Sequence, residues 1–285
     1  MPLNVSERSS TISYAIRDVA EYARKLESKG DKILKLNIGD PLKFDFKTPE
    51  PMVDAIVNAA RGSLNGYEDS LGNTELRRVI AERESKNNGK IYLEDVVVTS
   101  GVTEGVQLVF GATLEPGDEV LVPGPGYPTY TAYATFFGAT PVPYRTMEED
   151  NWNIDVQDLK SKITERTKCI VLINPNNPTG ATYSKKNLKE ILDIAIEHDV
   201  FIISDEIYDR ITFDDSFVSP ASMTDEVPIM TFNGISKIYL APGWRVGYMA
   251  FYNWDPLFDI KEGIMKELRA RITANSICQM GAIEA

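Results

Sequence analysis

The sequence predicts an α/β fold built on a mostly parallel sheet with helices on both faces. From residue 95 onward, apolar runs typical of strands alternate with runs typical of helices, which is the pattern of a doubly wound sheet. The alternation gives seven strands. The last two strands are joined by too short a link for a parallel crossover, so one strand is expected to be antiparallel.

The first part of the chain reads differently from the rest. One helix is expected over residues 10–29, because apolar side chains recur there on a single stripe. A short strand at 33–38 then leads into a turn. Two more helices are expected at 51–61 and 75–87, before the alternating pattern begins.

The alternating part supplies the sheet and the helices that cover it. Strands are expected at 95–99, 119–122, 140–144, 169–173, 200–204, 229–232 and 245–251. Helices are expected at 103–114, 127–137, 155–163, 184–197 and 256–272. In open α/β sheets, ligands bind beyond the carboxyl ends of the parallel strands, so the residues that follow each strand are the candidates for function.

Composition limits the classes of function. The 285 residues are 43% hydrophobic and 25% charged, as in soluble globular proteins, and no apolar run approaches the length of a membrane span. A net charge of −12 argues against a nucleic-acid partner. The N-terminus lacks the apolar core of a signal peptide, and Cys169 and Cys278 are isolated cysteines. A reducing, cytoplasmic location is therefore expected.

The single histidine excludes further chemistry. His198 lies in a polar stretch at the end of a predicted helix, where a cation is favourable. A Ser-His-Asp triad is therefore not expected, and neither is a metal site built on histidines. Neither the segment around Gly101 nor the one around Gly124 matches a GxGxxG fingerprint, which argues against a dinucleotide site.

Three segments after strands carry uncharged polar or aromatic candidates. Ser100, Gly101 and Val102 open a helix, where free N–H groups bind an anion, although for this segment alone an ordinary helix cap is the simpler explanation. Tyr127 follows a Pro-Gly-Pro-Gly run and can stack on a planar ring or simply pack under its own helix. The loop from Asn174 to Gly180 holds two prolines and a glycine, which fix a tight turn and aim an amide.

Charged candidates follow the last parallel strands. Asp205 ends an apolar run and needs a cationic partner, unless it caps a helix, and Tyr208 lies within reach of the same ligand. Lys237 follows the next strand, with Arg245 eight residues later. The amine can form a Schiff base with an aldehyde cofactor, and the guanidinium can hold its phosphate, as pyridoxal phosphate (PLP) requires. Alone, the lysine would be an exposed surface residue.

Taken together, these segments resemble a class I, fold-type-I PLP-dependent aminotransferase. The resemblance runs from about Ser13 to the end of the chain and is carried by Asn174–Gly180, Asp205–Tyr208, Ser236-Lys237 and Gly243–Gly247. Two further stretches, 36–41 and 231–237, are most similar to the alanine (glutamate–pyruvate) transaminase branch. The resemblance implies the fold-type-I architecture.

The resemblance also implies a role for each candidate. Lys237 would form the Schiff base and move the proton, and Asp205 would pair with the pyridine nitrogen. Asn177 and Tyr208 would bond the 3-oxygen of the cofactor, and Tyr127 would stack on its ring. The phosphate would be held by Ser100, Gly101, Val102, Ser236 and Arg245, and by Tyr67 of a neighbouring subunit, which implies a homodimer with shared sites. Gly39 would lie beside the substrate carboxylate.

For the whole chain, the resemblance implies an N-terminal arm and partial small domain at 1–45 and a large PLP-binding domain at 46–285. By the same resemblance, the rest of the small domain, with the arginine that clamps the substrate carboxylate, is expected to be missing from this sequence. The implied reaction moves the amino group of a small L-amino acid, alanine or aspartate, to a 2-oxo acid such as 2-oxoglutarate by a ping-pong route. Two alternatives stay open: a carbon–sulfur β-lyase of the same fold, and a truncated PLP-binding chain without activity.

Overall fold

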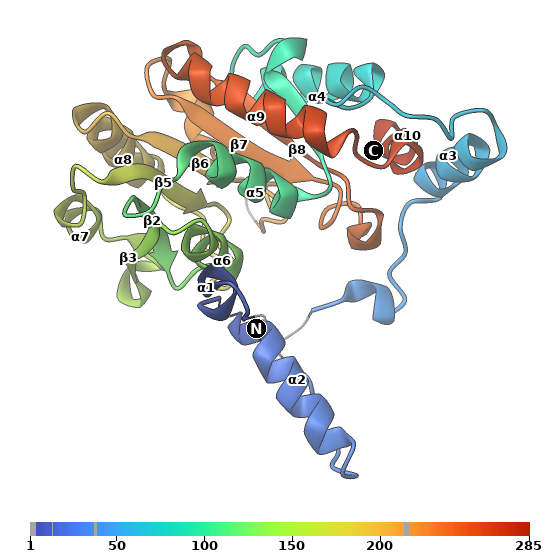
Figure 1. The fold of residues 1–285 in the computed structure, drawn as a ribbon, viewed down its shortest axis with the longest axis horizontal. Coiled ribbons are helices and arrows are strands. Elements are labelled where there is room, and N and C mark those ends of the chain that lie inside the picture. The colour runs from blue at the N-terminus through green and yellow to red at the C-terminus, as the bar shows by residue number, and fades with distance from the viewer. Residues whose placement is uncertain (1–3, 13, 37–38, 214–216) are drawn as a thin grey trace.

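The protein is described from a computed structural model, which covers residues 4–12, 14–36, 39–213 and 217–285 (Figure 1). The described strands form one sheet in the order β1-β8-β7-β6-β5-β2-β3-β4. They are β1 (Val96–Thr99), β2 (Glu119–Gly124), β3 (Thr140–Met147), β4 (Asn153–Ile154), β5 (Thr167–Ile173), β6 (Phe201–Asp205), β7 (Ile229–Gly234) and β8 (Gly247–Tyr252). No helix in the described part of the chain is both long and apolar enough to cross a membrane.

The pairing of the strands confirms the predicted sheet and adds one strand. β3, β2, β5, β6 and β7 pair in parallel, and β8 runs antiparallel to both β7 and β1. The addition is β4, a two-residue strand that pairs antiparallel with the edge strand β3. Two residues carry no alternating pattern of their own, so this strand has no signal in the sequence.

Helices cover both faces of the sheet, as predicted (Figure 1). One face packs on α5 (Val102–Thr113), α6 (Pro128–Phe136) and α9 (Phe258–Arg271), and the other on α4 (Thr74–Asn87), α7 (Val156–Ser161) and α8 (Lys185–Glu197). Alternate residues of a strand serve opposite cores: Val97 packs with the first group of helices, whereas Val96 and Val98 pack with the second. Side chains of a strand alternate between faces, so one apolar run fills both cores.

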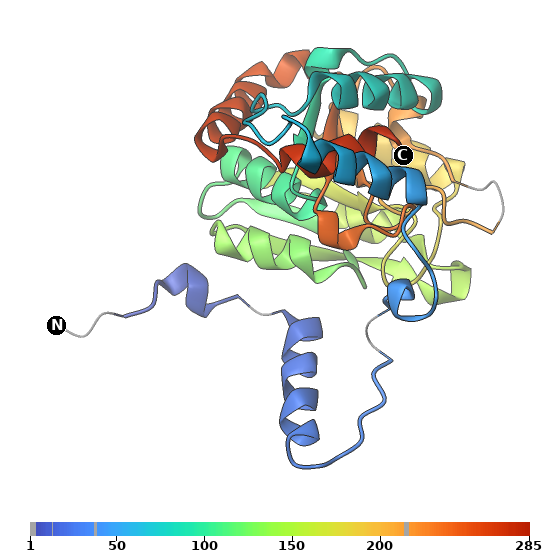
Figure 2. The same cartoon turned by 90° about the vertical axis from the view of Figure 1, so that its right-hand side faces the viewer.

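The N-terminal part differs most from its prediction. Instead of one helix over 10–29, the chain forms α1 (Glu7–Ser10) and α2 (Ala15–Glu27), and α2 stands apart from the body of the molecule (Figure 2). The described part of the expected strand at 33–38, residues 33–36, has no strand structure, and residues 37–38 lie outside the described residues. The domain boundary expected between residues 45 and 46 stays a prediction.

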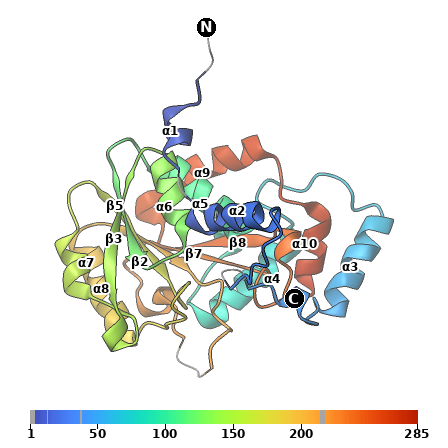
Figure 3. The ribbon, with the colours of Figure 1, turned by 90° about the horizontal axis from the view of Figure 1, so that it is seen from below.

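Two helices far apart in sequence close one end of the body. α3 (Glu50–Arg61) lies beside α10 (Ser276–Ile283), as the view from below shows (Figure 3). The contact is close, because a Cβ added to Gly281 would lie 2.8 Å from the side chains of Ile56 and Trp244. The short 3-10 helix η1 (Pro41–Lys43) lies between α2 and α3 in the chain.

Truncation of the central strand tests the two-layer core. Ile170 of β5 is fully buried, so Ile170→Ala should lower the free energy of unfolding by about 2–5 kcal/mol, since the packed sheet cannot collapse to fill the space. Lys186→Ala, at a side chain 87% exposed on α8, is the control and should leave it unchanged. Urea unfolding followed by circular dichroism measures both. Equal midpoints for the two variants would contradict the assigned core.

Candidate active site

Loops after the parallel strands meet around one cavity of about 120 Å³. Eight of the predicted site residues line it: Val102, Tyr127, Asn177, Asp205, Tyr208, Ser236, Lys237 and Arg245. The remaining lining residues are Thr103, Ile173, Ile207 and Pro242. The strand-end residues were expected to gather because the carboxyl ends of parallel strands share one edge of the sheet, and they do so here.

Asp205 is the most buried polar group of this cavity. It is the last residue of β6, and its side chain is 3% exposed. The Tyr130 hydroxyl donates to its Oδ2 at 2.8 Å, and the Ile207 N–H donates to Oδ1 at 3.2 Å. Burial raises the pKa of Asp205 to about 6, although both hydrogen bonds and the charge of Lys237 lower it. A carboxylate solvated mainly by neutral donors favours a cationic partner in the cavity.

The alternative role for Asp205, as a helix cap, is wrong. The residues after it form a turn, in which the Asp209 N–H donates to the Glu206 carbonyl and the Ile211 N–H to the Tyr208 carbonyl. This turn brings Tyr208 back to the cavity that Asp205 faces.

Neutral aromatic groups form the walls of the cavity. Burial raises the pKa of Tyr127 to about 12, and burial together with the charge of Asp205 raises the pKa of Tyr208 to about 12. Both phenols therefore keep their protons at neutral pH and can donate hydrogen bonds. Tyr14 of the N-terminal arm meets the Tyr127 ring edge-on, with 6.5 Å between the ring centroids.

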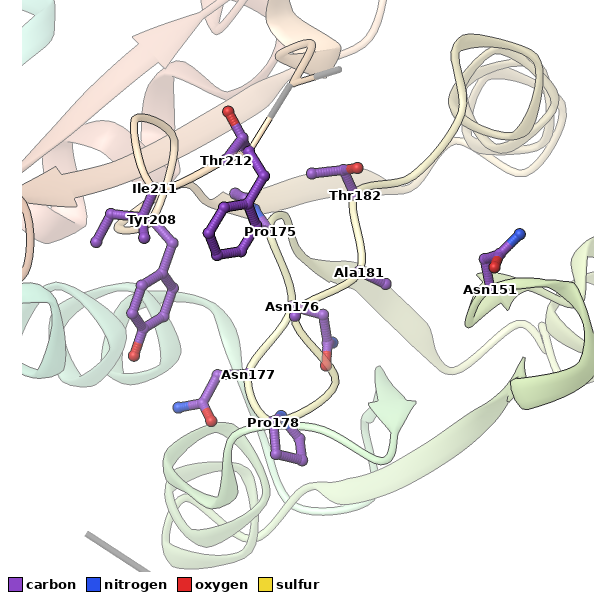
Figure 4. Close-up of a pocket in the computed structure, with 12 residues that line it drawn as sticks. Asn151, Pro175, Asn176, Asn177, Pro178, Ala181, Thr182, Tyr208, Ile211 and Thr212 are labelled. Atoms are coloured by element: carbon purple, nitrogen blue, oxygen red, sulfur yellow. The ribbon is translucent and has the colours of Figure 1, made fainter. Parts of the chain in front are cut away.

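Hydrogen bonds on the side away from the cavity hold the loop after β5, and one amide of this loop lines the cavity. Asn174 accepts from the Tyr183 N–H and donates to the Val218 carbonyl. Asn176 donates to the Tyr183 hydroxyl and accepts from Thr179. Asn177, by contrast, lines the cavity beside Tyr208. Both residues also line a neighbouring hollow of about 540 Å³ (Figure 4).

Lys237 and Arg245 form the cationic side of the cavity. Lys237 is exposed, as expected of an ordinary surface lysine. It nevertheless lines the cavity, with its Nζ 5.7 Å from the centre of the Tyr208 ring. Arg245 was expected to be the first residue of a strand. It instead precedes β8, with a φ of 53° in the left-handed region, an uncommon conformation for a residue other than glycine. Its guanidinium donates to the carbonyls of Ser100, at 3.3 Å, and Pro242, at 3.1 Å.

The turn before α5 packs directly against Arg245. Gly101 has a φ of 77°, which is strained for any residue other than glycine, and a Cβ there would lie 2.4 Å from an Arg245 Nη atom, so a larger residue would also displace the guanidinium. Two of the N–H groups predicted to bind an anion are already bonded: Ser100 N–H to the Glu104 carboxylate and Gly101 N–H to the Thr99 carbonyl. The first N–H groups of α5, which have no partner within a helix, therefore remain for that role.

The residues that line the cavity fit PLP. A buried carboxylate suits a protonated ring nitrogen, Lys237 suits an aldehyde, and Arg245 with the start of α5 suits a phosphate. Among the described residues there is no cluster of acidic, histidine or cysteine side chains suited to a metal ion.

Four predicted residues do not line this cavity: Ser100 and Gly101, in the turn before α5, and Tyr67 and Gly39. Tyr67 is 86% exposed in the segment between α3 and α4, and its expected contact with a second subunit stays a prediction. Gly39 is exposed in the N-terminal arm, with open space where a Cβ would stand. Sequence analysis missed Tyr130, although its spacing of three from Tyr127 places both on one side of a helix start.

Comparison with known proteins agrees with this geometry. The family model described as "Aminotransferase class I and II" matches residues 31–278. The chain belongs to this family. Members of the class I family use pyridoxal phosphate, so the predicted cofactor agrees with the family as well as with the cavity.

Individual relatives support the predicted branch. The chain is 42% identical over 249 residues to an alanine aminotransferase of Mycobacterium bovis, covering 86% of this chain and 58% of that protein. It is 41% identical over 252 residues to a glutamate-pyruvate aminotransferase of Escherichia coli K12, covering 87% and 62%. A solved alanine aminotransferase from Pyrococcus furiosus superposes with a TM-score of 0.95 at 51% identity, covering 98% and 72%. The chain thus spans about three fifths of the length of these curated relatives.

The hydrogen bond between Tyr130 and Asp205 gives a prediction for the isolated protein. This bond lowers the pKa of Asp205, so Tyr130→Phe should raise that pKa above its wild-type value of about 6. Carboxyl-carbon NMR of aspartate-labelled protein, titrated from pH 4 to 8 without cofactor, would measure the change.

A matched control exists for this variant. Tyr144→Phe removes an equally buried hydroxyl that donates to the Val171 carbonyl at 2.7 Å, and should leave the titration of Asp205 unchanged. A rise of the pKa in both variants, or in neither, would show that the Tyr130 hydroxyl does not control Asp205.

Proposed function

We propose that this chain is a PLP-dependent aminotransferase that moves the amino group of a small L-amino acid to a 2-oxo acid such as 2-oxoglutarate. The observation that carries the proposal is that Asp205 and Lys237 face one cavity between neutral tyrosines. Alanine is the proposed donor, with aspartate the second choice, because the similar proteins include alanine and glutamate-pyruvate aminotransferases.

Each residue around the cavity has a proposed task. When bound, PLP supplies an aldehyde for an amine and a ring that withdraws electrons from the reacting carbon. Lys237 would be the amine that holds this aldehyde, and its Nζ would also serve as the base that takes and returns a proton. Asp205 holds a proton on the ring nitrogen, because a buried carboxylate stabilises a cation beside it. Asn177 and Tyr208 donate hydrogen bonds to the ring oxygen.

The other end of the cofactor and the second subunit complete the proposal. Arg245, Ser236 and the first residues of α5 hold the phosphate, and Tyr127 stacks on the ring. Tyr67, which is 86% exposed, is free to reach the site of a second copy in a homodimer. Both cysteines are free thiols, which suits the proposed cytoplasmic location.

The covalent role of Lys237 is tested by trapping. Borohydride reduction of the PLP-loaded protein should add the mass of reduced PLP to the peptide that contains Lys237 and to no other lysine peptide, because among the described residues Lys237 is the lysine that lines the cavity. Lys237→Ala should lose the adduct, and Lys168→Ala, an exposed lysine paired with Asp118, should keep it. A Lys237→Ala protein that is still labelled to the same extent would overturn the assignment.

The reaction is tested by single-turnover mixing with L-alanine. The aminotransferase predicts one equivalent of pyruvate per site, with the amino group retained on the protein until a 2-oxo acid removes it. A β-lyase would instead release ammonia together with a 2-oxo acid, from a substrate with a leaving group on Cβ. Binding of PLP without either reaction would refute transamination by this chain and leave only cofactor binding.

A further inference from the structure

The turn that carries Asp205 and Tyr208 has a second, opposite side. Glu206 and Asp209 belong to the same turn but point away from the cavity, toward α4 and β8. Glu206 is 1% exposed, and its backbone N–H donates to the Phe232 carbonyl of β7. Contacts that fix Glu206 and Asp209 therefore also fix Asp205 and Tyr208, which face the cofactor site.

Glu206 lies among polar groups that give it no cation. The hydroxyls of Ser204 and Ser219 donate to its Oε1 at 2.8 and 2.6 Å. The Asn88 amide faces its Oε2 at 3.5 Å and at the same time donates to Glu84 at 2.7 Å. One amide thus bridges two buried carboxyl groups, because Glu84 is only 2% exposed.

The surrounding charges do not balance if every acid is ionised. Glu84 accepts from the Tyr248 and Tyr252 hydroxyls at 2.6 and 2.8 Å. Arg83 is the basic residue paired within this cluster: it bonds Tyr248 and Asp209, and its guanidinium lies 3.7 Å from Glu84. The guanidinium of Arg83 therefore serves Asp209 and Glu84 but not Glu206, although the charge of Arg210 also acts on Asp209.

We propose that Glu206 is a positioning residue that keeps its proton at neutral pH, and that this neutral acid holds the Asp205–Asp209 turn in the form that presents Asp205 and Tyr208 to the cavity. Arg83 and Asp209 take up one ion pair, and Glu84 is satisfied by its three donors. Glu206 is left as the acid with no cation, so its ionisation would place an unpaired charge beside Glu84.

Electrostatics agree with this placement of the proton. Burial, followed by the charge of Glu84, raises the pKa of Glu206 to about 8, while the bonds from Ser219 and Ser204 lower it. A carboxyl group whose pKa is higher in the closed turn than in an opened, solvated one stabilises the closed turn at low pH. That stabilisation is lost as the pH rises toward 8 and changes no further above it.

Hydrogen exchange of the full chain without cofactor tests the turn directly. After correction for intrinsic exchange, opening of the peptide that contains Glu206 should increase up to about tenfold per pH unit between pH 6.5 and 8, and then level off. Glu206→Gln, which imitates the neutral acid, should keep the turn closed and remove the increase. Asp205 titrates at about pH 6, so its contribution lies below this window.

Two controls separate positioning from general stability. Glu119→Gln alters another buried glutamate, which lies at the start of β2 and is bonded to Thr164 and Arg166. This variant should leave the pH dependence of hydrogen exchange in the turn unchanged. Glu206→Ala should open the turn at every pH. A Glu206→Gln protein as open as Glu206→Ala at pH 7, or a wild-type turn with no pH dependence in this window, would overturn the proposal.

The consequence for the cofactor rests on the proposed function. PLP affinity, measured by equilibrium dialysis, should fall between pH 6.5 and 8 more steeply in the wild type than in Glu206→Gln. Failure of PLP to bind either protein would refute the proposed function and leave the exchange result standing. Equal pH dependence of PLP affinity in both proteins, with the exchange difference present, would refute the link between the turn and the cofactor.

Discussion

The burial of Asp205 is the constraint on which the rest of the site depends. Its carboxylate ends a central strand of the sheet, where apolar neighbours and neutral donors surround it. Such a charge is unfavourable unless a cation comes close, and Lys237 is the cation that acts on it in this structure. The desolvation free energy that disfavours the ionised Asp205 on its own also makes the cavity selective for a ligand that brings a positive charge to it.

The turn after β6 serves two environments at once. Its cavity side holds Asp205 and Tyr208, and its other side joins α4 and β8 through Glu206 and Asp209. A buried polar network of this kind stabilises little unless each member has a partner, but it defines one geometry sharply. The network therefore explains how a short, irregular segment can hold two functional groups in fixed positions.

The sequence predicted the parts of the fold and site that local pattern determines. The seven main strands and the helices of the alternating region followed from apolar periodicity. Most of the eight cavity residues followed from the rule for strand ends, whereas Ser236 and the choice of Asn177 within its loop came from the family resemblance. The rest depends on contacts between distant segments. β4 is too short for a pattern, the guanidinium of Arg245 packs on Gly101 from a distant segment, and Tyr130 gains its role only from its distance to Asp205.

Glu206 shows the same limit most clearly. In the sequence it is one acid beside another. In the fold the two side chains leave the strand in opposite directions, Asp205 toward Tyr130 of α6 and Glu206 toward Asn88 at the end of α4. Alternation along a strand thus places two neighbouring acids in different environments. A cationic ligand favours the ionised form of Asp205, whereas the nearby Glu84 favours the neutral form of Glu206.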